Sequence, residues 1–161
     1  MTPLLGLQYA GQPTTKIDAT AIAPQLYQGS VPPNGRALAD ARFTMLVLAA
    51  REYQPRSANF PGLRVVLHAP LNDDVPTSSE VAAAMNAATY VVDEIKRGGK
   101  VLVTCLQGRN RSGLISALAL RKLYGFSGKQ VLSQVQTMRA NALTNPWFQQ
   151  LLSDLPSRSP R

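Results

Sequence analysis

Short runs of β-branched and aliphatic residues alternate along the chain with longer stretches of helical periodicity. We expect buried strands at residues 22–30, 44–49, 63–67 and 101–104, because each run is apolar and bounded by Gly, Pro or polar residues. Strands that alternate with helices favour a parallel or mixed sheet covered on both faces. The pattern therefore predicts an α/β fold with a central, mostly parallel sheet of four to five strands flanked by helices on both faces.

Helical periodicity predicts helices at residues 34–42, 77–97 and 112–124, and two more that begin near 127 and 145. T-S-S-E and S-x-x-Q sequences with capping-box spacing open the second and fourth helices, and Asn-Pro opens the last. The helix over 112–124 is apolar almost all round, which predicts a buried central helix. In the other long helices the predicted core positions are Val81, Met85, Ala88, Val92, Ile95, Val131, Val135, Met138, Phe148, Leu151, Leu152 and Leu155.

Length and composition are those of one folded domain, with 161 residues of which 45% are hydrophobic. We expect an N-terminal arm over residues 1–20 with a short strand near 16–19, a domain over 21–155, and a flexible basic tail over 156–161. No apolar run approaches the roughly eighteen residues of a membrane span, and no basic region precedes a hydrophobic segment at the N-terminus. We therefore expect a soluble, cytoplasmic protein without stable membrane insertion.

The charge and the cysteine content of the chain indicate which kinds of ligand and which redox compartment suit it. Lys and Arg number 17 against 9 acidic residues, giving a net charge of +8. Such a surface attracts polyanions, although for most of the arginines a solvated basic face that aids solubility is the preferred explanation. The single cysteine excludes an internal disulfide and suits a reducing compartment. His68, the only histidine, has no second metal ligand nearby in the sequence, so we expect neither a metal nor a cofactor.

The chemistry centres on residues 101–116, which read V-L-V-T-C-L-Q-G-R-N-R-S-G-L-I-S. The strand ends at Cys105, a loop follows around Gly108, and a helix begins at Ser112. Loop amides beside a helix N-terminus form an anion site, and the guanidinium of Arg111 can bind two phosphate oxygens at once. The same positive field favours the thiolate of Cys105 over the thiol. Gly108 allows close backbone approach, and Ser112 can place its hydroxyl near the sulfur.

This segment resembles the signature loop of the cysteine-dependent protein phosphatases, most closely the dual-specificity subfamily. The matching pattern is Cys105-x-x-Gly108-x-x-Arg111-Ser112-Gly113 after a V-x-V strand. The I-x-x-x-L-Y-x-G-S stretch that begins at Ile22 and the N-P-W-F-Q-Q-L stretch near the C-terminus also resemble the family, so the likeness spans residues 22–152. The alternative for the cysteine is a buried, inert thiol, which would explain neither the glycines nor the arginine.

A phosphatase must also deliver a proton to the leaving oxygen, and the loop A-P-L-N-D-D-V-P offers two carboxylates, Asp73 and Asp74. The family resemblance favours Asp73, because the general-acid loop of the family lies at this distance before the cysteine. Either residue could instead form a turn, and we expect Asp74 to do so.

The resemblance implies a two-step reaction through a cysteinyl-phosphate and a phosphorylated protein as the substrate. A chain this short is expected to have a shallow pocket, open to phosphotyrosine and to phosphoserine or phosphothreonine, and to act as a monomer. The site residues implied are Cys105, Arg111, Asp73 and Ser112 for catalysis, and Leu106, Gln107, Gly108, Arg109, Asn110 and Arg111 for substrate binding.

Three features of the sequence leave open alternatives to an active protein phosphatase. Thr104 stands where the family has His before the cysteine, which favours a catalytically weak pseudophosphatase that binds phosphorylated partners. The extra basic residue Arg109 resembles the inositol-lipid phosphatases, and the G-x-N-R sequence resembles RNA 5′-triphosphatases.

Overall fold

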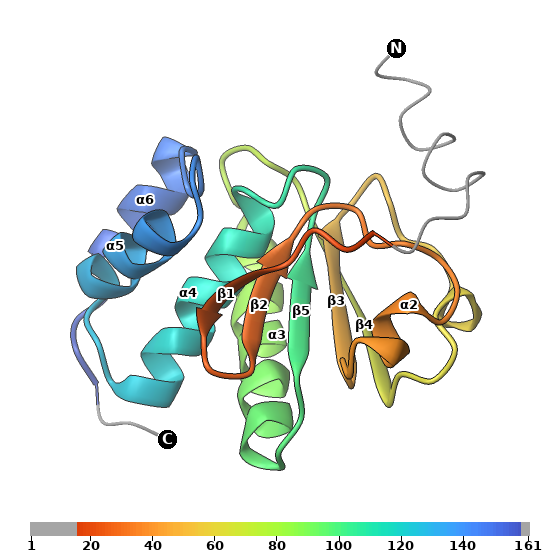
Figure 1. Cartoon of the computed structure of the whole chain (residues 1–161). Helices are drawn as coiled ribbons and strands as arrows, with labels where there is room; N and C mark the ends of the chain where they lie inside the picture. Colours follow the sequence, from red (N-terminus) through yellow and green to blue (C-terminus); the bar gives the residue numbers. More distant parts are fainter. Residues whose placement is uncertain (1–15, 159–161) are drawn as a thin grey trace.

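A five-stranded sheet forms the centre of the computed structural model, which describes residues 16–158 (Figure 1). The strand order is β1-β2-β5-β3-β4; β1 and β2 are antiparallel and the other neighbours are parallel. The elements in chain order are β1 (Thr20–Ala23), β2 (Leu26–Gly29), α2 (Ala37–Asp40), β3 (Met45–Ala50), the 3₁₀ helix η1 (Ser57–Asn59), β4 (Val65–Leu71), α3 (Ser78–Lys96), β5 (Val101–Thr104), α4 (Arg111–Tyr124), α5 (Gly128–Met138) and α6 (Pro146–Ser153).

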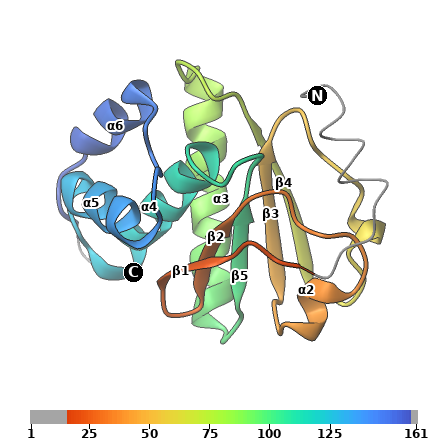
Figure 2. The same ribbon diagram turned by 45° about the horizontal axis from the view of Figure 1, so that its top comes forward.

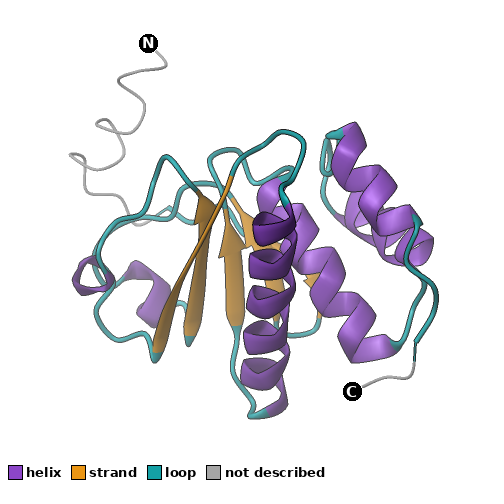
Figure 3. Ribbon diagram, turned by 180° about the vertical axis from the view of Figure 1, so that it is seen from behind, coloured by secondary structure: helices purple, strands orange, loops and turns teal. Residues whose placement is uncertain are grey.

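Strand β3 shows how the sheet is covered on both sides. Met45 and Val47 point into the core cluster formed with α3 and α4, whereas Leu46 and Leu48 point into the opposite cluster, which includes Leu38 of α2. Successive strand residues face opposite sides, so an uninterrupted apolar strand requires cover on both faces. The helices α3 to α6 lie on one side of the sheet and α2 on the other (Figures 1 and 3). The predicted α/β fold is confirmed.

Helix α4 is the buried central helix that the sequence predicts. Every residue from Arg111 to Leu120 is buried. The three predicted helix starts are also present, because Thr77 and Ser127 form capping boxes and the side chain of Asn145 accepts hydrogen bonds from the first turn of α6. The head of α4 is therefore a rigid support for the loop that precedes it.

The predicted core face of α3 is confirmed at Ala88 and Val92, but the rest of it is shifted by about one position. Met85 is exposed and Val81 and Ile95 are only partly buried, and at the end of α5 Met138 is exposed as well. Alanine lets the backbones of α3 and α4 approach closely, so the alanine-rich side of α3 turns inward and the longer methionine turns out. The residues of α3 that enter the core are Ala84, Ala87, Ala88, Val91 and Val92.

The strand boundaries near the N-terminus also differ from the prediction. Residues 22–30 form parts of two antiparallel strands rather than one, because the chain reverses at Pro24 and Gln25, and Gln25 has φ 69°. The predicted strand at 63–67 begins later and continues to Leu71, and the predicted helix at 34–42 shortens to α2. The structure assigns no strand to residues 16–19.

Both chain ends extend beyond the described part of the protein. Most of the expected arm (residues 1–15) and the end of the expected tail (159–161) lie outside the described residues. The described part of the tail is bonded to the domain, since the backbone N–H of Arg158 donates to Gly125 O (3.1 Å) and Arg121 Nε donates to Pro156 O (2.8 Å). Within residues 16–158, no helix is long and apolar enough to cross a lipid bilayer.

The parallel strands bring three chemically active positions to one edge of the sheet. β3, β4 and β5 run in the same direction, with Val101 opposite Met45 and Met45 opposite Val65. Glu52, Asp73 and Cys105 follow the carboxyl ends of these strands, at the edge turned forward in Figure 2. In open α/β sheets, ligands bind at this edge.

Candidate active site

Cys105 lies at the bottom of the loop that joins β5 to α4. Its backbone N–H donates to Gly29 O (3.3 Å), which continues the pairing of β5 with β2 by one residue. The side chain is largely buried, and Sγ lies 3.2 Å from Ser112 Oγ in the first turn of α4. The sulfur therefore lies against a hydroxyl at a helix N-terminus rather than among aliphatic groups alone.

The carbonyl groups of the loop are held away from the pocket. Arg139 Nη2 donates to Gln107 O (3.2 Å), and Arg139 Nε donates to Gly108 O (2.6 Å). Gln28 Nε2 donates to the same Gly108 oxygen (2.9 Å). In a trans peptide the following N–H points opposite to the carbonyl. The bonds to Arg139 and Gln28 therefore turn the next two amides toward the other side of the loop.

A third loop carbonyl is held in the same way, because the backbone N–H of Leu143 donates to Arg109 O (2.9 Å). The amides of Gly108, Arg109 and Asn110 consequently face the pocket, and such converging amides attract anions. Gly108 has φ 68°, and a Cβ there would lie 2.7 Å from Gly29 O. Only glycine fits this turn of the loop without displacing β2.

Arg139 connects the loop to the start of the described chain. Its guanidinium also donates to both carboxylate oxygens of Asp18 (3.0 and 2.7 Å), to Thr20 Oγ1 (2.8 Å) and to Gln28 O (3.2 Å). The hydrogen bonds from Arg139 lower the pKa of Asp18. Arg139 is thus a fixed anchor for the loop.

Replacing Arg139 with methionine is expected to lower kcat/KM for p-nitrophenyl phosphate by about tenfold, because the carbonyls of Gln107 and Gly108 lose their anchor and the amides lose their alignment. Arg121→Met is the matched control, since Arg121 binds a backbone carbonyl far from this loop. Steady-state kinetics on both variants, with thermal melts to verify folding, makes the comparison. Equal kcat/KM in Arg139→Met and in the unaltered protein would contradict this role.

Arg111, the first residue of α4, points into the site and is held by a carboxylate. Its Nη1 and Nη2 atoms donate to Glu52 (2.5 and 2.9 Å), and Nη1 also donates to Leu71 O (3.1 Å). Burial lowers the pKa of Arg111, but the hydrogen bonds to Glu52 and the nearby negative charges outweigh it and raise that pKa. The same hydrogen bonds lower the pKa of Glu52. The buried Nε of Arg111 has no hydrogen-bond partner among residues 16–158, and it remains able to bind an anion.

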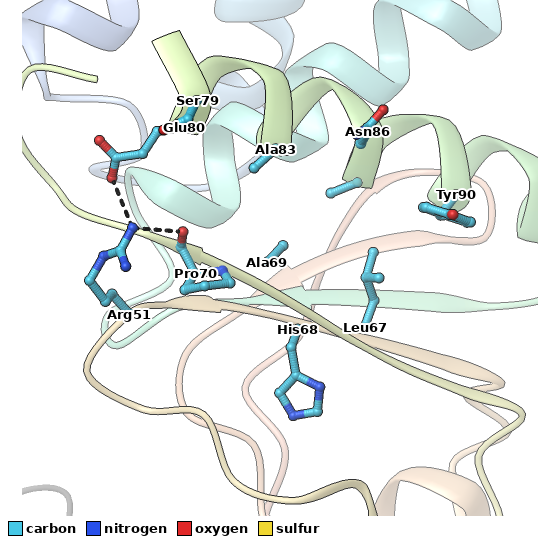
Figure 4. A pocket seen from close by; sticks show the side chains of 11 residues that line it. Arg51, Leu67, His68, Ala69, Pro70, Ser79, Glu80, Ala83, Asn86 and Tyr90 are labelled. Carbon is cyan, nitrogen blue, oxygen red and sulfur yellow. Dashed lines mark hydrogen bonds and ion pairs between the residues drawn. The ribbon is translucent and has the colours of Figure 1, made fainter. Parts of the chain in front are cut away.

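These groups surround a cavity of about 270 Å³. A larger cavity of about 370 Å³ lies between the edge strand β4 and α3, where Arg51 pairs with Glu80 (Figure 4), and it contains no residue of the loop. The smaller cavity is therefore the candidate active site. It is lined by Glu52, Asp73, Cys105, Leu106, Gln107, Arg109, Asn110 and Arg111.

The segment A-P-L-N-D-D-V-P (residues 69–76), here called the acid loop, carries two carboxylates that lie differently relative to the cavity. Asp73 lines the cavity beside Cys105, whereas Asp74 does not and instead accepts a hydrogen bond from the N–H of Val75 (2.8 Å) at its Oδ1 atom. This bond is local to the segment and leaves the Asp74 carboxylate outside the cavity. Asp73 is thus the carboxylate within reach of a substrate bound at the loop.

Two other residues considered from the sequence lie outside the cavity lining. Thr104 is buried, and its hydroxyl donates to Val47 O (2.8 Å), so it ties β5 to β3 rather than holding the loop. His68 lies within β4 and its Nε2 is 2.8 Å from Pro55 O. Over residues 16–158, no group of three or more His, Cys, Asp or Glu side chains is arranged to hold a metal ion.

Comparison with known proteins identifies the family. No protein-family model matches the chain. Human dual specificity phosphatase 28 is 33% identical over 131 residues, which cover 79% of this chain and 71% of the human protein. The chain belongs to the dual-specificity phosphatase family. The crystal structure of the human protein matches this phosphatase with a TM-score of 0.70 and 27% identity, over 88% of this chain and 93% of the crystallised one.

A plant relative supports the same assignment over a shorter stretch. Dual specificity protein phosphatase 1 of Arabidopsis thaliana is 42% identical over 65 residues, which are 40% of this chain and 33% of the plant protein. The phosphatase therefore spans about a third of that relative's length.

Sequence reasoning missed several residues of the phosphatase site. Glu52 and Gln28 reach the loop only because their strands flank β5, and Arg139 and Asn145 come from distant helix ends. A signal was available for Glu52 alone, since it lies in the loop after the strand predicted at 44–49, whose carboxyl end is expected at the same edge as Cys105.

Proposed function

We propose that this phosphatase hydrolyses phosphotyrosine and phosphoserine or phosphothreonine in proteins through a cysteinyl-phosphate intermediate. The observation that carries this proposal is the loop itself, whose carbonyls are bonded outward so that its amides converge on the cavity lined by Cys105 and Arg111. A converging set of N–H groups with a guanidinium stabilises the negative charge on the equatorial oxygens during phosphoryl transfer.

In the first step the thiolate of Cys105 attacks phosphorus in line with the leaving oxygen. The S–P bond forms as the P–O bond breaks, and Asp73 gives its proton to the departing alkoxide or phenolate. The loop amides and Arg111 hold the three non-bridging oxygens throughout this step. General acid catalysis of this kind contributes roughly 10²- to 10⁴-fold.

In the second step Asp73, now a carboxylate, takes a proton from a water molecule that attacks the phosphocysteine. The S–P bond breaks, inorganic phosphate forms, and the sulfur leaves as a thiolate. Ser112 Oγ, 3.2 Å from Sγ, is placed to donate a hydrogen bond to the leaving sulfur. This hydroxyl therefore favours breakdown of the intermediate.

The cavity lining supports a broad choice of phosphorylated residue. Among residues 16–158, those that line the cavity include no aromatic side chain, so none of them selects a phenyl ring by stacking. The exposed guanidinium of Arg109 at the cavity favours a second candidate, a phosphoinositide with an additional phosphate.

Substrate class is tested by assaying phosphate release from phosphotyrosine and phosphothreonine peptides, phosphoinositides and 5′-triphosphorylated RNA, with Arg109→Ala in parallel. We expect both peptides to react fastest and Arg109→Ala to change their kcat/KM by no more than a few-fold. Preference for a phosphoinositide that is lost in Arg109→Ala would establish the second candidate instead. Preference for the RNA would exclude both.

A further inference from the structure

Two asparagine side chains donate to the carboxylate of Asp73 from different segments. Asn145 Nδ2 donates to Asp73 Oδ1 (2.8 Å), and Asn110 Nδ2 donates to Asp73 Oδ2 (3.0 Å). Asn110 belongs to the phosphate-binding loop, and Asn145 is the N-cap of α6. Each carboxylate oxygen thus has its own amide donor.

Hydrogen bonds to the backbone fix the orientation of both amides. Asn145 Oδ1 accepts from the N–H groups of Trp147 (2.8 Å) and Phe148 (3.1 Å), so Nδ2 is the group left to face Asp73. Asn110 Oδ1 accepts from the backbone N–H of Asn145 (2.9 Å), which leaves its Nδ2 for Asp73 as well. Since a backbone N–H can only donate, neither amide can turn over and still satisfy these contacts.

Neither asparagine interaction is explained by helix capping alone. The side chain of Asn110 makes no capping bond at the start of α4, although it occupies the N-cap position. Asn145 does cap α6, but its Nδ2 is not needed for that cap and bonds instead to Asp73 and to Asp74 O (3.3 Å). Both donors are therefore committed to the acid loop.

We propose that Asn110 and Asn145 are positioning residues that hold Asp73 in place for proton transfer. The inference rests on the proposed function, in which Asp73 is the general acid. Because Asn110 is part of the phosphate-binding loop, it fixes the acid relative to the loop that holds the phosphate. The bond from the N–H of Asn72 to Glu80 Oε2 (2.8 Å) holds the acid loop from its other side. A misplacement of about 1 Å can cost roughly 10²-fold in rate.

The test uses the dependence of kcat/KM on the leaving group. Phenyl phosphate has a poor leaving group that needs the proton, whereas p-nitrophenyl phosphate depends on it less. Asn145→Ser retains an N-cap hydroxyl for α6 but is too short to reach Asp73. Ser127→Ala, which removes the cap of α5 away from the site, is the matched control for lost stability. Asn110→Ala removes the other donor.

We expect Asn145→Ser and Asn110→Ala each to lower kcat/KM for phenyl phosphate by roughly 10- to 100-fold, and that for p-nitrophenyl phosphate by much less. Ser127→Ala should leave the ratio of the two values unchanged. In an Asp73→Asn background, Asn145→Ser should cause no further loss, because it acts through Asp73. The proposal would be overturned if the losses caused by Asp73→Asn and Asn145→Ser multiply in the double variant. It would also be overturned if both asparagine variants leave the ratio of the two kcat/KM values unchanged.

The single variant Asp73→Asn distinguishes a failure of the positioning role of the asparagines from a failure of the general-acid role of Asp73. A loss of about 10²-fold with phenyl phosphate in Asp73→Asn, together with unaltered asparagine variants, would refute only the positioning role. An unaltered Asp73→Asn protein would refute the general-acid role itself, and with it this inference.

Discussion

Replacement of Cys105 by serine is expected to lower kcat for p-nitrophenyl phosphate by roughly 10⁴-fold or more. A serine hydroxyl is nearly the size of the thiol, so the loop and its contact with Ser112 should persist. It is, however, almost entirely un-ionised near neutral pH and is a far poorer nucleophile than a thiolate. The chain has no other cysteine that could replace it.

The measurement combines turnover with trapping of the intermediate. Acid quenching during turnover followed by mass spectrometry should find phosphate on Cys105 in the unaltered phosphatase and none in Cys105→Ser. Ser112→Ala is the matched control, because it retains the nucleophile and slows breakdown of the intermediate, so the trapped fraction should rise. Turnover of Cys105→Ser at the unaltered rate would rule out the covalent mechanism through Cys105. Absence of turnover in both proteins would instead favour the phosphate-binding alternative suggested by Thr104.

Apart from Asp73, which the family resemblance favours, the part of the site that the sequence predicts is contained in one local segment. A strand, a loop with an inner glycine and a helix N-terminus are each set by neighbouring residues, so the sequence alone predicts that Cys105, Gly108 and Arg111 lie together. The fold class could be predicted for a similar reason, because uniformly apolar strands demand cover on both faces. Local rules also placed the N-caps at Thr77, Ser127 and Asn145 correctly.

What the sequence could not predict depends on packing between distant segments. The alanine-rich face of α3 is favoured only because α4 lies against it, and apolar periodicity alone also fits the neighbouring face with Met85. The bonds from Arg139 and Gln28 to the loop join residues far apart in the chain. The two amides on Asp73 depend in the same way on where α6 begins relative to the loop. Nothing in the local sequence encodes these distances.

The second large effect is expected for Arg111→Lys, which should lower kcat/KM for p-nitrophenyl phosphate by roughly 10³-fold. Lysine retains the positive charge but loses the planar fork that binds two phosphate oxygens, and loss of a single oxyanion donor costs roughly 10²- to 10³-fold. The ammonium group also cannot reproduce the paired bonds to Glu52 and the bond to Leu71 O. Inorganic phosphate should become a weaker competitive inhibitor in the same variant.

Arg109→Lys is the control for this substitution, since Arg109 lines the same cavity and is exposed. Its exposed charge is screened by solvent, so kcat/KM should change by only a few-fold. Glu52→Gln distinguishes alignment from charge, because the amide retains one acceptor for Arg111 while removing the carboxylate that holds the guanidinium in the free enzyme. A smaller loss than in Arg111→Lys is expected there. If Arg111→Lys and Arg109→Lys were equally mild, the guanidinium fork of Arg111 would not be what stabilises the transition state.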